Sequence, residues 1–251
     1  DFTLQFKGTF TFARNKVLEY DEAPGLRPGM KTVGRRLNTF LGYVTNGLYE
    51  NYTDVEESPT STLGNIAISP GDIKYVDQPD ANGNYDGRIT SDDRVEIGDP
   101  WIPEIVYGFG PSMRWKNWDF SFFFQGQTNV SLIMENFEPF GERSARGVLA
   151  WIADDYWSPD HPNVNAKHPR LTRLTNNHNM QVSTYWLRDA SFLKLKNVEL
   201  GYSYKKARFY ISGSNLLTIS PFKHWDPEVG TGAGMQYPTQ RIFNLGIQMS
   251  F

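Results

Sequence analysis

One stretch of the chain has oxygen-bearing side chains at the spacing of a calcium-binding loop. Residues 82–93 place them at loop positions 1, 3, 5, 9 and 12, with a glycine at position 6. Calcium takes about six to eight hard oxygen ligands, and the glycine permits the sharp turn that gathers them. The sequence therefore predicts Ca²⁺ as a cofactor. The predicted ligands are Asn82, Asn84, Asp86, the carbonyl oxygen of Arg88, Thr90 and Asp93.

Two departures from the ideal pattern keep a metal-free interpretation open. The first position is Asn82, where Asp is usual, and the last is Asp93, where a longer, bidentate Glu is usual. The alternative is a turn rich in Asn and Asp that is held by hydrogen bonds from its side chains to its own backbone.

The remaining candidate groups do not form a catalytic pattern. Asp154 and Asp155 are paired carboxylates of the kind that glycosidases use, but adjacent residues point apart on a helix or strand. We predict a short amphipathic helix over residues 145–156, with these two residues at its solvated end. None of the histidines has the helical spacing of a zinc enzyme. The sequence thus predicts no enzyme. The histidines are His161, His168, His178 and His224, all in predicted loops.

Composition narrows the class of protein further. The 251 residues carry a net charge of −3, which gives no basic field for nucleic acid. Only 39% of the residues are hydrophobic, yet 15% are aromatic, which favours a surface where apolar and polar side chains alternate. No stretch approaches the roughly 20 apolar residues of a membrane helix. The absence of cysteine excludes disulfides and thiolate metal sites.

Period-two alternation is the strongest structural signal. In residues 2–12 the even positions are apolar or glycine, and the odd positions are Thr, Gln or Lys. Two faces of such different polarity need two different solvents. The same alternation recurs along the chain. We predict strands near residues 2–14, 103–116, 118–127, 191–204, 207–218 and 241–251.

One predicted strand changes parity along its length. Leu193 and Leu195 share one face, whereas Val198 and Leu200 belong to the other parity. A β-bulge near Lys196 and Asn197 would restore a common apolar face, because one extra residue shifts the alternation.

The connections alternate between short and long. Tight turns are predicted at Lys116-Asn117 and Lys205-Lys206, whereas residues 16–101, 129–190 and 220–240 form long loops. Short periplasmic turns and long extracellular loops are typical of outer-membrane β-barrels. Six strands cannot enclose a wide lumen, so we expect one arc of a larger barrel. The alternative is a soluble β-sandwich with one wet face.

Short motifs along the whole chain resemble, in order, those of one family: the SusC/RagA-like TonB-dependent transporters of Bacteroidetes outer membranes. The first are GYVTNGLY at 42–49, PGDIKYVD at 70–77, DGRI at 86–89 and DDRVEIG at 92–98. The next are YGFG at 107–110, WSP at 157–159, PRL at 169–171 and SFLKLKN at 191–197. The last are LGY at 200–202, SNLL at 214–217, DPEV at 226–229 and the terminal Phe251.

The resemblance implies an all-β fold, namely the C-terminal arc of an antiparallel transmembrane β-barrel of about 22 strands. The N-terminal plug and the TonB-contacting segment of such transporters have no counterpart in these residues. The implied partners are therefore the remainder of the transporter, a SusD-like surface lipoprotein, and TonB-ExbB-ExbD through the missing N-terminal part. Phe251 resembles the aromatic residue that barrel-assembly machinery recognises. The implied location is the bacterial outer membrane.

The resemblance also bears on the calcium loop. In the family's shorter form this loop would start at Asp77, so residues 79–85 look like an insertion. Asp77 or Asp80 would then supply the first carboxylate in place of Asn82.

The leading functional prediction is the wall and loops of an importer of glycans, or of peptides or other oligomers. The alternatives are a passive or scaffolding outer-membrane barrel and a secreted carbohydrate-binding β-sandwich. The sequence does not identify the substrate-binding residues. Aromatic residues in loops stack on sugars in some proteins, but more often they hold loops against one another. Those aromatic residues are Trp101, Phe137, Phe140, Trp151, Trp157, Trp186 and Trp225.

Overall fold

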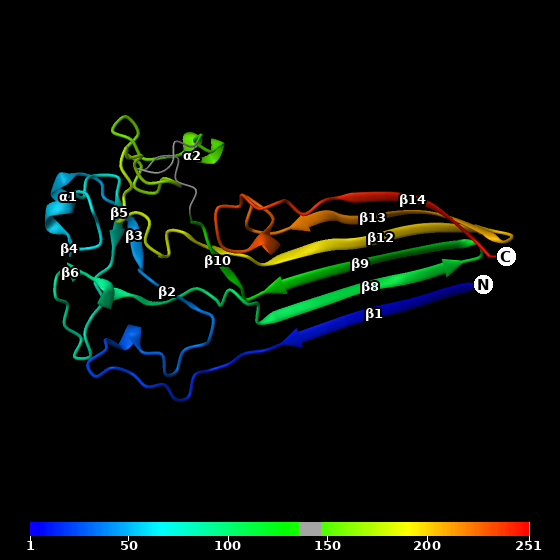
Figure 1. Cartoon of the computed structure of the whole chain (residues 1–251), viewed down its shortest axis with the longest axis horizontal. Coiled ribbons are helices and arrows are strands. Elements are labelled where there is room, and N and C mark those ends of the chain that lie inside the picture. The colour runs from blue at the N-terminus through cyan, green and yellow to red at the C-terminus, as the bar shows by residue number, and fades with distance from the viewer. Residues whose placement is uncertain (136–146, 251) are drawn as a thin grey trace.

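A long six-stranded antiparallel sheet carries a loop-built head at one end (Figure 1). The computed structural model describes residues 1–135 and 147–250. The predicted antiparallel sheet of six strands is confirmed, with neighbours in the order β1-β8-β9-β12-β13-β14. These strands are β1 (Phe2–Phe12), β8 (Ile105–Trp115), β9 (Trp118–Thr128), β12 (Phe192–Tyr204), β13 (Ala207–Ile219) and β14 (Ile242–Met249).

The strand register gathers the large apolar side chains on one face of the sheet. Cross-strand partners such as Phe10 with Tyr107 point the same way, because side chains alternate along each strand. This face has no second layer over it in the described part of the chain: Phe6 is 67% exposed and Leu245 87%. The β-sandwich interpretation is therefore wrong, since it requires these residues to be packed in a core.

The two hairpin turns lie at the end of the sheet that is farthest from the head, as do both chain termini (Figure 1). β8 turns into β9 through Lys116 (φ 53°), and β12 turns into β13 through Lys205 (φ 52°). Positive φ at these positions suits two-residue hairpin loops, whose twist matches that of the strands.

The predicted bulge in β12 is confirmed. The pairing of β12 with β9 and with β13 shifts between Leu195 and Asn197, so Lys196 is the extra residue. A second irregularity, which the alternation did not reveal, lies in β13 at Asn215 (φ 56°), where three steps along β13 match two along β12. Together the two irregularities keep Leu200 and Ile211 in register further down the strands.

Short elements organise the segments predicted as long loops into the head. Four small two-stranded sheets pair β2 with β7, β3 with β5, β4 with β6 and β10 with β11. The strands are β2 (Phe40–Gly42), β3 (Thr45–Leu48), β4 (Thr60–Ser61), β5 (Ile73–Tyr75), β6 (Arg88–Ile89), β7 (Val95–Ile97), β10 (Ser131–Ile133) and β11 (Leu187–Asp189). The helices are η1 (Pro28–Met30), α1 (Tyr52–Glu57), η2 (Ser91–Asp93), α2 (Ala150–Asp154) and η3 (Pro227–Val229).

Helices play a small part in the fold. In the segment predicted as a helix over 145–156, α2 covers Ala150–Asp154, and residues 145 and 146 lie outside the described residues. Among residues 1–135 and 147–250, no helix is long and apolar enough to span a membrane.

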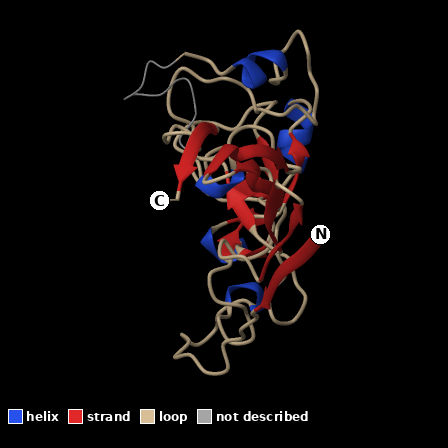
Figure 2. Ribbon diagram, turned by 90° about the vertical axis from the view of Figure 1, so that its right-hand side faces the viewer, coloured by secondary structure: helices blue, strands red, loops and turns tan. Residues whose placement is uncertain are grey.

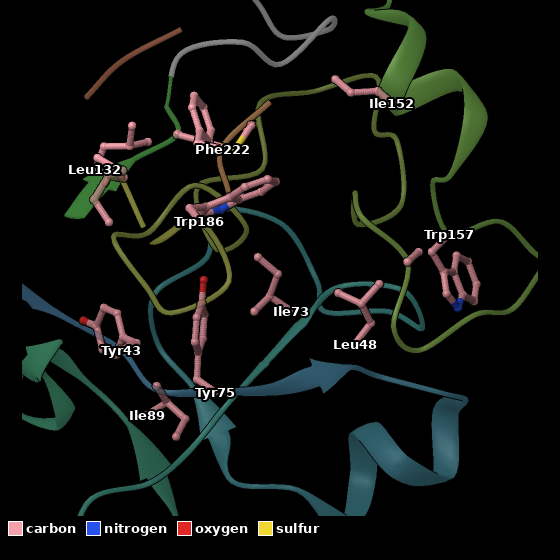
Figure 3. Packing of buried hydrophobic residues seen from close by; sticks show 14 of the residues in the cluster. Tyr43, Leu48, Ile73, Tyr75, Ile89, Leu132, Ile152, Trp157, Trp186 and Phe222 are labelled. Atoms are coloured by element: carbon pink, nitrogen blue, oxygen red, sulfur yellow. The ribbon is translucent and has the colours of Figure 1, made fainter. Parts of the chain in front are cut away.

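The hydrophobic core of the molecule lies in the head (Figure 3). Tyr75 and Ile73 come from the first long connection, Trp186 from the second and Phe222 from the third, and all are buried in one cluster. The three connections therefore fold into one packed unit. Seen from the end that carries both chain termini, loops of the head extend above and below the strands (Figure 2).

Ion pairs join the head to the sheet. Glu104, which is 4% exposed and directly precedes β8, accepts hydrogen bonds from Arg14 at 2.6 Å, Arg36 at 3.3 Å and Asn129 at 3.3 Å. Arg14 follows β1 and Asn129 follows β9, so one carboxylate links the ends of three neighbouring strands. Through Arg36 the same carboxylate also contacts the first long connection.

Candidate functional site

Three carboxylates of the predicted calcium loop converge on one arginine. Arg27 donates to Asp93 Oδ1 at 2.7 Å and to Asp86 Oδ2 at 2.5 Å, and Asp77 Oδ1 lies 3.8 Å from its Nη1. Asp93 is fully buried and Asp77 nearly so, whereas Asp86 is half exposed. The guanidinium therefore occupies the point at which the three side chains meet, and its charge offsets part of theirs.

The Asp77 carboxylate is only half satisfied. Its Oδ2 accepts from the backbone N–H of Gly87 at 2.8 Å, but its buried Oδ1 has no hydrogen-bond partner. Burial raises the pKa of Asp77, and the neighbouring charges of Asp93 and Asp86 add to that rise. This orphaned oxygen is the part of the cluster that receives a hydrogen bond neither from Arg27 nor from the backbone.

A second group of predicted ligands forms a separate turn. The carboxylate of Asp80 accepts from the backbone N–H of Asn82 at 2.8 Å and of Asn84 at 2.9 Å. Hydrogen bonds from these N–H groups lower the pKa of the exposed Asp80 carboxyl. This is the metal-free turn that the sequence left open as the alternative, and it uses the oxygens of Asp80 for its own backbone.

The last two predicted ligands have local structural roles. Thr90 and Asp93 form a capping box at η2, in which each side chain accepts from the backbone at the start of the helix. Arg88 lies in β6, which pairs with β4. In residues 1–135 and 147–250, no group of three or more acidic or histidine side chains has a geometry that could hold a metal ion. Calcium binding stays a prediction, with Asp77, Asp86 and Asp93 as its remaining ligands.

Sequence reasoning missed Arg27, which lies 50 residues before Asp77 in the chain and carries no local signal. The capping box had a signal, namely Thr followed by an acidic residue three positions later. Only the tertiary fold places Arg27 beside these carboxylates.

A second carboxylate holds the first long connection against the second. Asp72, which is 1% exposed, accepts from Arg170 at 2.7 and 3.0 Å, from Asn176 at 2.9 Å and from Asn179 at 2.8 Å. The backbone N–H of Ser69 donates to it as well, at 2.9 Å. Every lone-pair direction of this buried charge is thus used, which makes its burial stable.

Three of the sequence motifs meet near Asp72. Gly71 of PGDIKYVD has φ of +85°, and a Cβ there would lie 2.3 Å from the indole of Trp157 in the WSP motif. Arg170 of the PRL motif also donates its backbone N–H to the carbonyl of Gly71, at 2.9 Å. The PGDIKYVD, WSP and PRL motifs therefore pack against one another in the head. This contact explains their residue types by packing rather than by a catalytic or binding role.

The buried histidines are structural. His178 Nε2 donates to the carbonyl of Ile73 at 2.7 Å, which leaves Nδ1 as an acceptor for Ser61 at 3.1 Å. His168 Nδ1 donates to the carbonyl of Pro169 at 2.8 Å. Burial lowers the pKa of His178, and it lowers the pKa of His168 to about 4. Both rings are therefore neutral at pH 7.

A buried lysine anchors the third long connection. Lys194 of β12 is 0% exposed, and its Nζ donates to Asp226 at 2.5 Å and to Glu228 at 2.5 Å. Lys196, the bulge residue, also donates to Glu228 at 2.5 Å. The DPEV motif is thus the anion pair that docks residues 220–240 onto the sheet.

The structure separates the aromatic residues of the loops. Trp157 and Trp186 belong to the head core and pin loops together, whereas Trp101 is 49% exposed. Phe137 and Phe140 lie outside the described residues. Trp151 and Trp225 pack partly against the core, at its edge. Among the loop aromatic residues that the structure describes, Trp101 alone combines a ring that is about half exposed with a partner that holds it, since its ring centre lies 5.4 Å from that of Phe40.

The paired carboxylates do not converge. Asp154 ends α2, and Asp155 lies 3.8 Å from Lys167 in an exposed ion pair.

Comparison with known proteins shows that the chain is similar to TonB-dependent receptors. No family model matches it. TonB-dependent receptor P3 of Formosa agariphila is 28% identical over 288 aligned positions, which cover all of this chain and 27% of the relative. TonB-dependent receptor SusC of Bacteroides thetaiotaomicron is 26% identical, over all of this chain and 25% of the relative. The chain spans about a quarter of the length of these relatives.

Solved structures show the same fold. The structure of the RagAB peptide transporter matches the whole of this chain with a TM-score of 0.71 at 23% identity. The match covers 27% of the transporter chain. The RagAB peptide importer in its 'open-open' state matches with a TM-score of 0.70 at 21% identity. The predicted all-β barrel fold and the resemblance to SusC/RagA-like TonB-dependent transporters are both confirmed.

We expect Asp72→Asn to loosen the head. The new amide would turn its NH₂ toward the donors of Asn176 or Asn179 and would leave Arg170 without its anion. Breaking a buried pair in this way costs about 3 kcal/mol. Hydrogen exchange of residues 170–180 should accelerate accordingly. Asp160→Asn, at an exposed position, is the matched control and should leave exchange unchanged. Equal protection in both variants would contradict the role of Asp72.

Calcium binding can be tested by replacing Arg27, which contacts the same carboxylates. Calcium and the guanidinium would compete for the same carboxylates, so Arg27→Gln should raise calcium affinity at least about tenfold, a change on the order of 1.4 kcal/mol. Terbium luminescence, displaced by calcium, measures this. The double variant Arg27→Gln/Asp77→Asn should lose the signal. Silence in the wild type and in Arg27→Gln alike would leave the metal-free turn as the correct interpretation.

Proposed function

We propose that this chain forms part of the wall and the outer head of a TonB-dependent importer in the bacterial outer membrane. The observation that supports this most directly is the exposed apolar face of the six-stranded sheet, which the hydrocarbon of a membrane would cover favourably. Within residues 1–135 and 147–250, β1 and β14 each pair with a neighbour on one side of the sheet only. Because open edges do not survive in lipid, the remainder of the transporter would supply the missing strands.

The two ends of the sheet support one orientation. Tight turns close one end, and a packed head built from three long connections covers the other. In outer-membrane barrels the long connections are extracellular. The head would then stand outside the cell, where its surface meets substrate first, and the turns would face the periplasm.

Transport itself would depend on the rest of the protein. The polar face of the sheet would line the lumen, which a plug fills in such importers, and TonB-ExbB-ExbD would supply the energy through the N-terminal part. The related structures are those of a peptide importer, so peptides join glycans and other oligomers as the proposed substrates. Catalysis has no place in this proposal.

A SusD-like lipoprotein is the proposed outer partner. The head carries exposed aromatic residues, including Tyr237 at 78% and Tyr52 at 66%. Aromatic residues are enriched at protein interfaces, and long outer loops are the surfaces such a lid would meet. The passive or scaffolding barrel remains the second candidate, because it requires the same wall and head.

Placement in the membrane can be tested by cysteine labelling, since the chain has no cysteine of its own. With a bulky hydrophilic maleimide, Leu18→Cys in the head should react on intact cells. Asn117→Cys in a turn should react only after the outer membrane is permeabilised. Phe10→Cys on the apolar face should stay unlabelled until the protein is unfolded. Labelling of Phe10→Cys in the folded protein would exclude contact with lipid.

Import can be tested separately from placement. Cells that depend on this gene should take up one class among a panel of labelled oligosaccharides and peptides, and uptake should stop when the proton gradient is collapsed. A gene deletion is the control. Uptake that persists without the gradient would favour the passive barrel.

A further inference from the structure

The turn end of the sheet carries aromatic side chains on its apolar face. We call Trp115, Trp118, Tyr202 and Tyr204 the aromatic row. Trp115 pairs with Trp118 across the first hairpin, and Trp118 pairs with Tyr202 of the next strand, with their rings 4.7 Å apart. The row thus continues across three neighbouring strands at one level of the sheet.

A hollow lies beside the row. It measures about 430 Å³ and is lined entirely by apolar side chains, those of Phe2, Met113, Trp115, Trp118 and Phe120. These residues belong to β1, β8 and β9, and all share the apolar face. The row therefore borders a depression that a hydrocarbon chain fits chemically.

Lysines from both turns reach back over the row. Lys116 Nζ lies 5.2 Å from the ring centre of Trp115, and Lys205 Nζ lies 5.4 Å from that of Tyr204. Such cation–π contacts hold an ammonium in place while its charge stays available to a second ligand. The turns thus place a fixed positive charge at each end of the row.

Neither lysine has a carboxylate partner in the described part of the chain. Asp1, whose backbone carbonyl accepts from the Lys116 N–H at 3.1 Å, precedes Phe2 and so has the parity of the polar face of β1. The nearby acids Asp119 and Glu199 are both engaged by Arg208. They lie on the opposite, polar face, where Gly201 makes room for them: a Cβ there would meet Arg208 at 2.5 Å and Asp119 at 2.6 Å. The sheet thereby keeps its acids away from the apolar face at this level and leaves the lysines unneutralised.

The geometry points to a binding site for an anionic phospholipid, with its phosphate between Lys116 and Lys205 and an acyl chain in the hollow. The site rests on the proposed function, because the lipid reaches it only if the apolar face lies in the membrane. An ammonium near an anionic headgroup contributes about fivefold in affinity. The two lysines therefore select for negative charge, whereas the aromatic row and hollow alone would accept any phospholipid.

The test is quenching of tryptophan fluorescence by brominated lipids. The complete importer is placed in vesicles that contain either brominated phosphatidylglycerol, which is anionic, or brominated phosphatidylcholine, which is zwitterionic. The wild type should prefer the anionic lipid. Lys116→Gln and Lys205→Gln should each reduce that preference about fivefold. Trp115→Phe/Trp118→Phe should remove most of the quenching, which assigns the signal to the row.

Lys223→Gln is the matched control, because Lys223 is an exposed lysine of the head. It should keep the full preference. Equal quenching of the wild type by the two lipids would overturn the site while leaving the membrane placement intact. A preference that survives the double variant Lys116→Gln/Lys205→Gln would also overturn it. No quenching by either lipid would instead refute the proposed function.

Discussion

The six-stranded sheet has no hydrophobic core of its own, and this constraint governs the rest of the molecule. Burying one large apolar side chain stabilises a protein by about 2 kcal/mol, yet residues such as Phe10 and Leu245 remain exposed. The sheet therefore depends on a second apolar phase for its stability. Its other face, which is polar, needs water or a polar partner. Alternation of apolar and polar residues along each strand gives the sheet one apolar face and one polar face. The sheet therefore separates an apolar environment from a polar one.

The head solves the opposite problem, because it must hold together in water with little regular structure. Its short strands give few ladder hydrogen bonds, so side chains bridge the connections instead. Asp72 joins the first connection to the second, and Lys194 joins the third to the sheet. Both charged groups are buried and all their hydrogen-bonding positions are used. Loss of one partner would therefore leave a buried charge unpaired, which is strongly destabilising. Packing of Trp186 and Phe222 against the same core makes the head one unit.

The charged groups are sorted by where they lie in the fold. Carboxylates gather in the head, where arginine and lysine neutralise them, as Arg27 does for Asp86 and Asp93. At the far end, lysines stand over aromatic rings on the apolar face, and acids are confined to the polar face. This arrangement gives the molecule two ends of different chemistry, which suits a protein with one end toward each side of a membrane.

The sequence by itself determined the sheet, because period-two alternation is a local pattern and forces side chains to opposite faces. It also located the bulge at Lys196, since the alternation changes parity there. It did not determine the head. Arg27, Asp72 and Lys194 have partners from 32 to more than 100 residues away, and no periodicity encodes such pairings. Spacing alone predicts that residues 82–93 form one set of calcium ligands. Only the tertiary structure divides that set, because Arg27 draws Asp86 and Asp93 to one side while Asp80 holds its own turn.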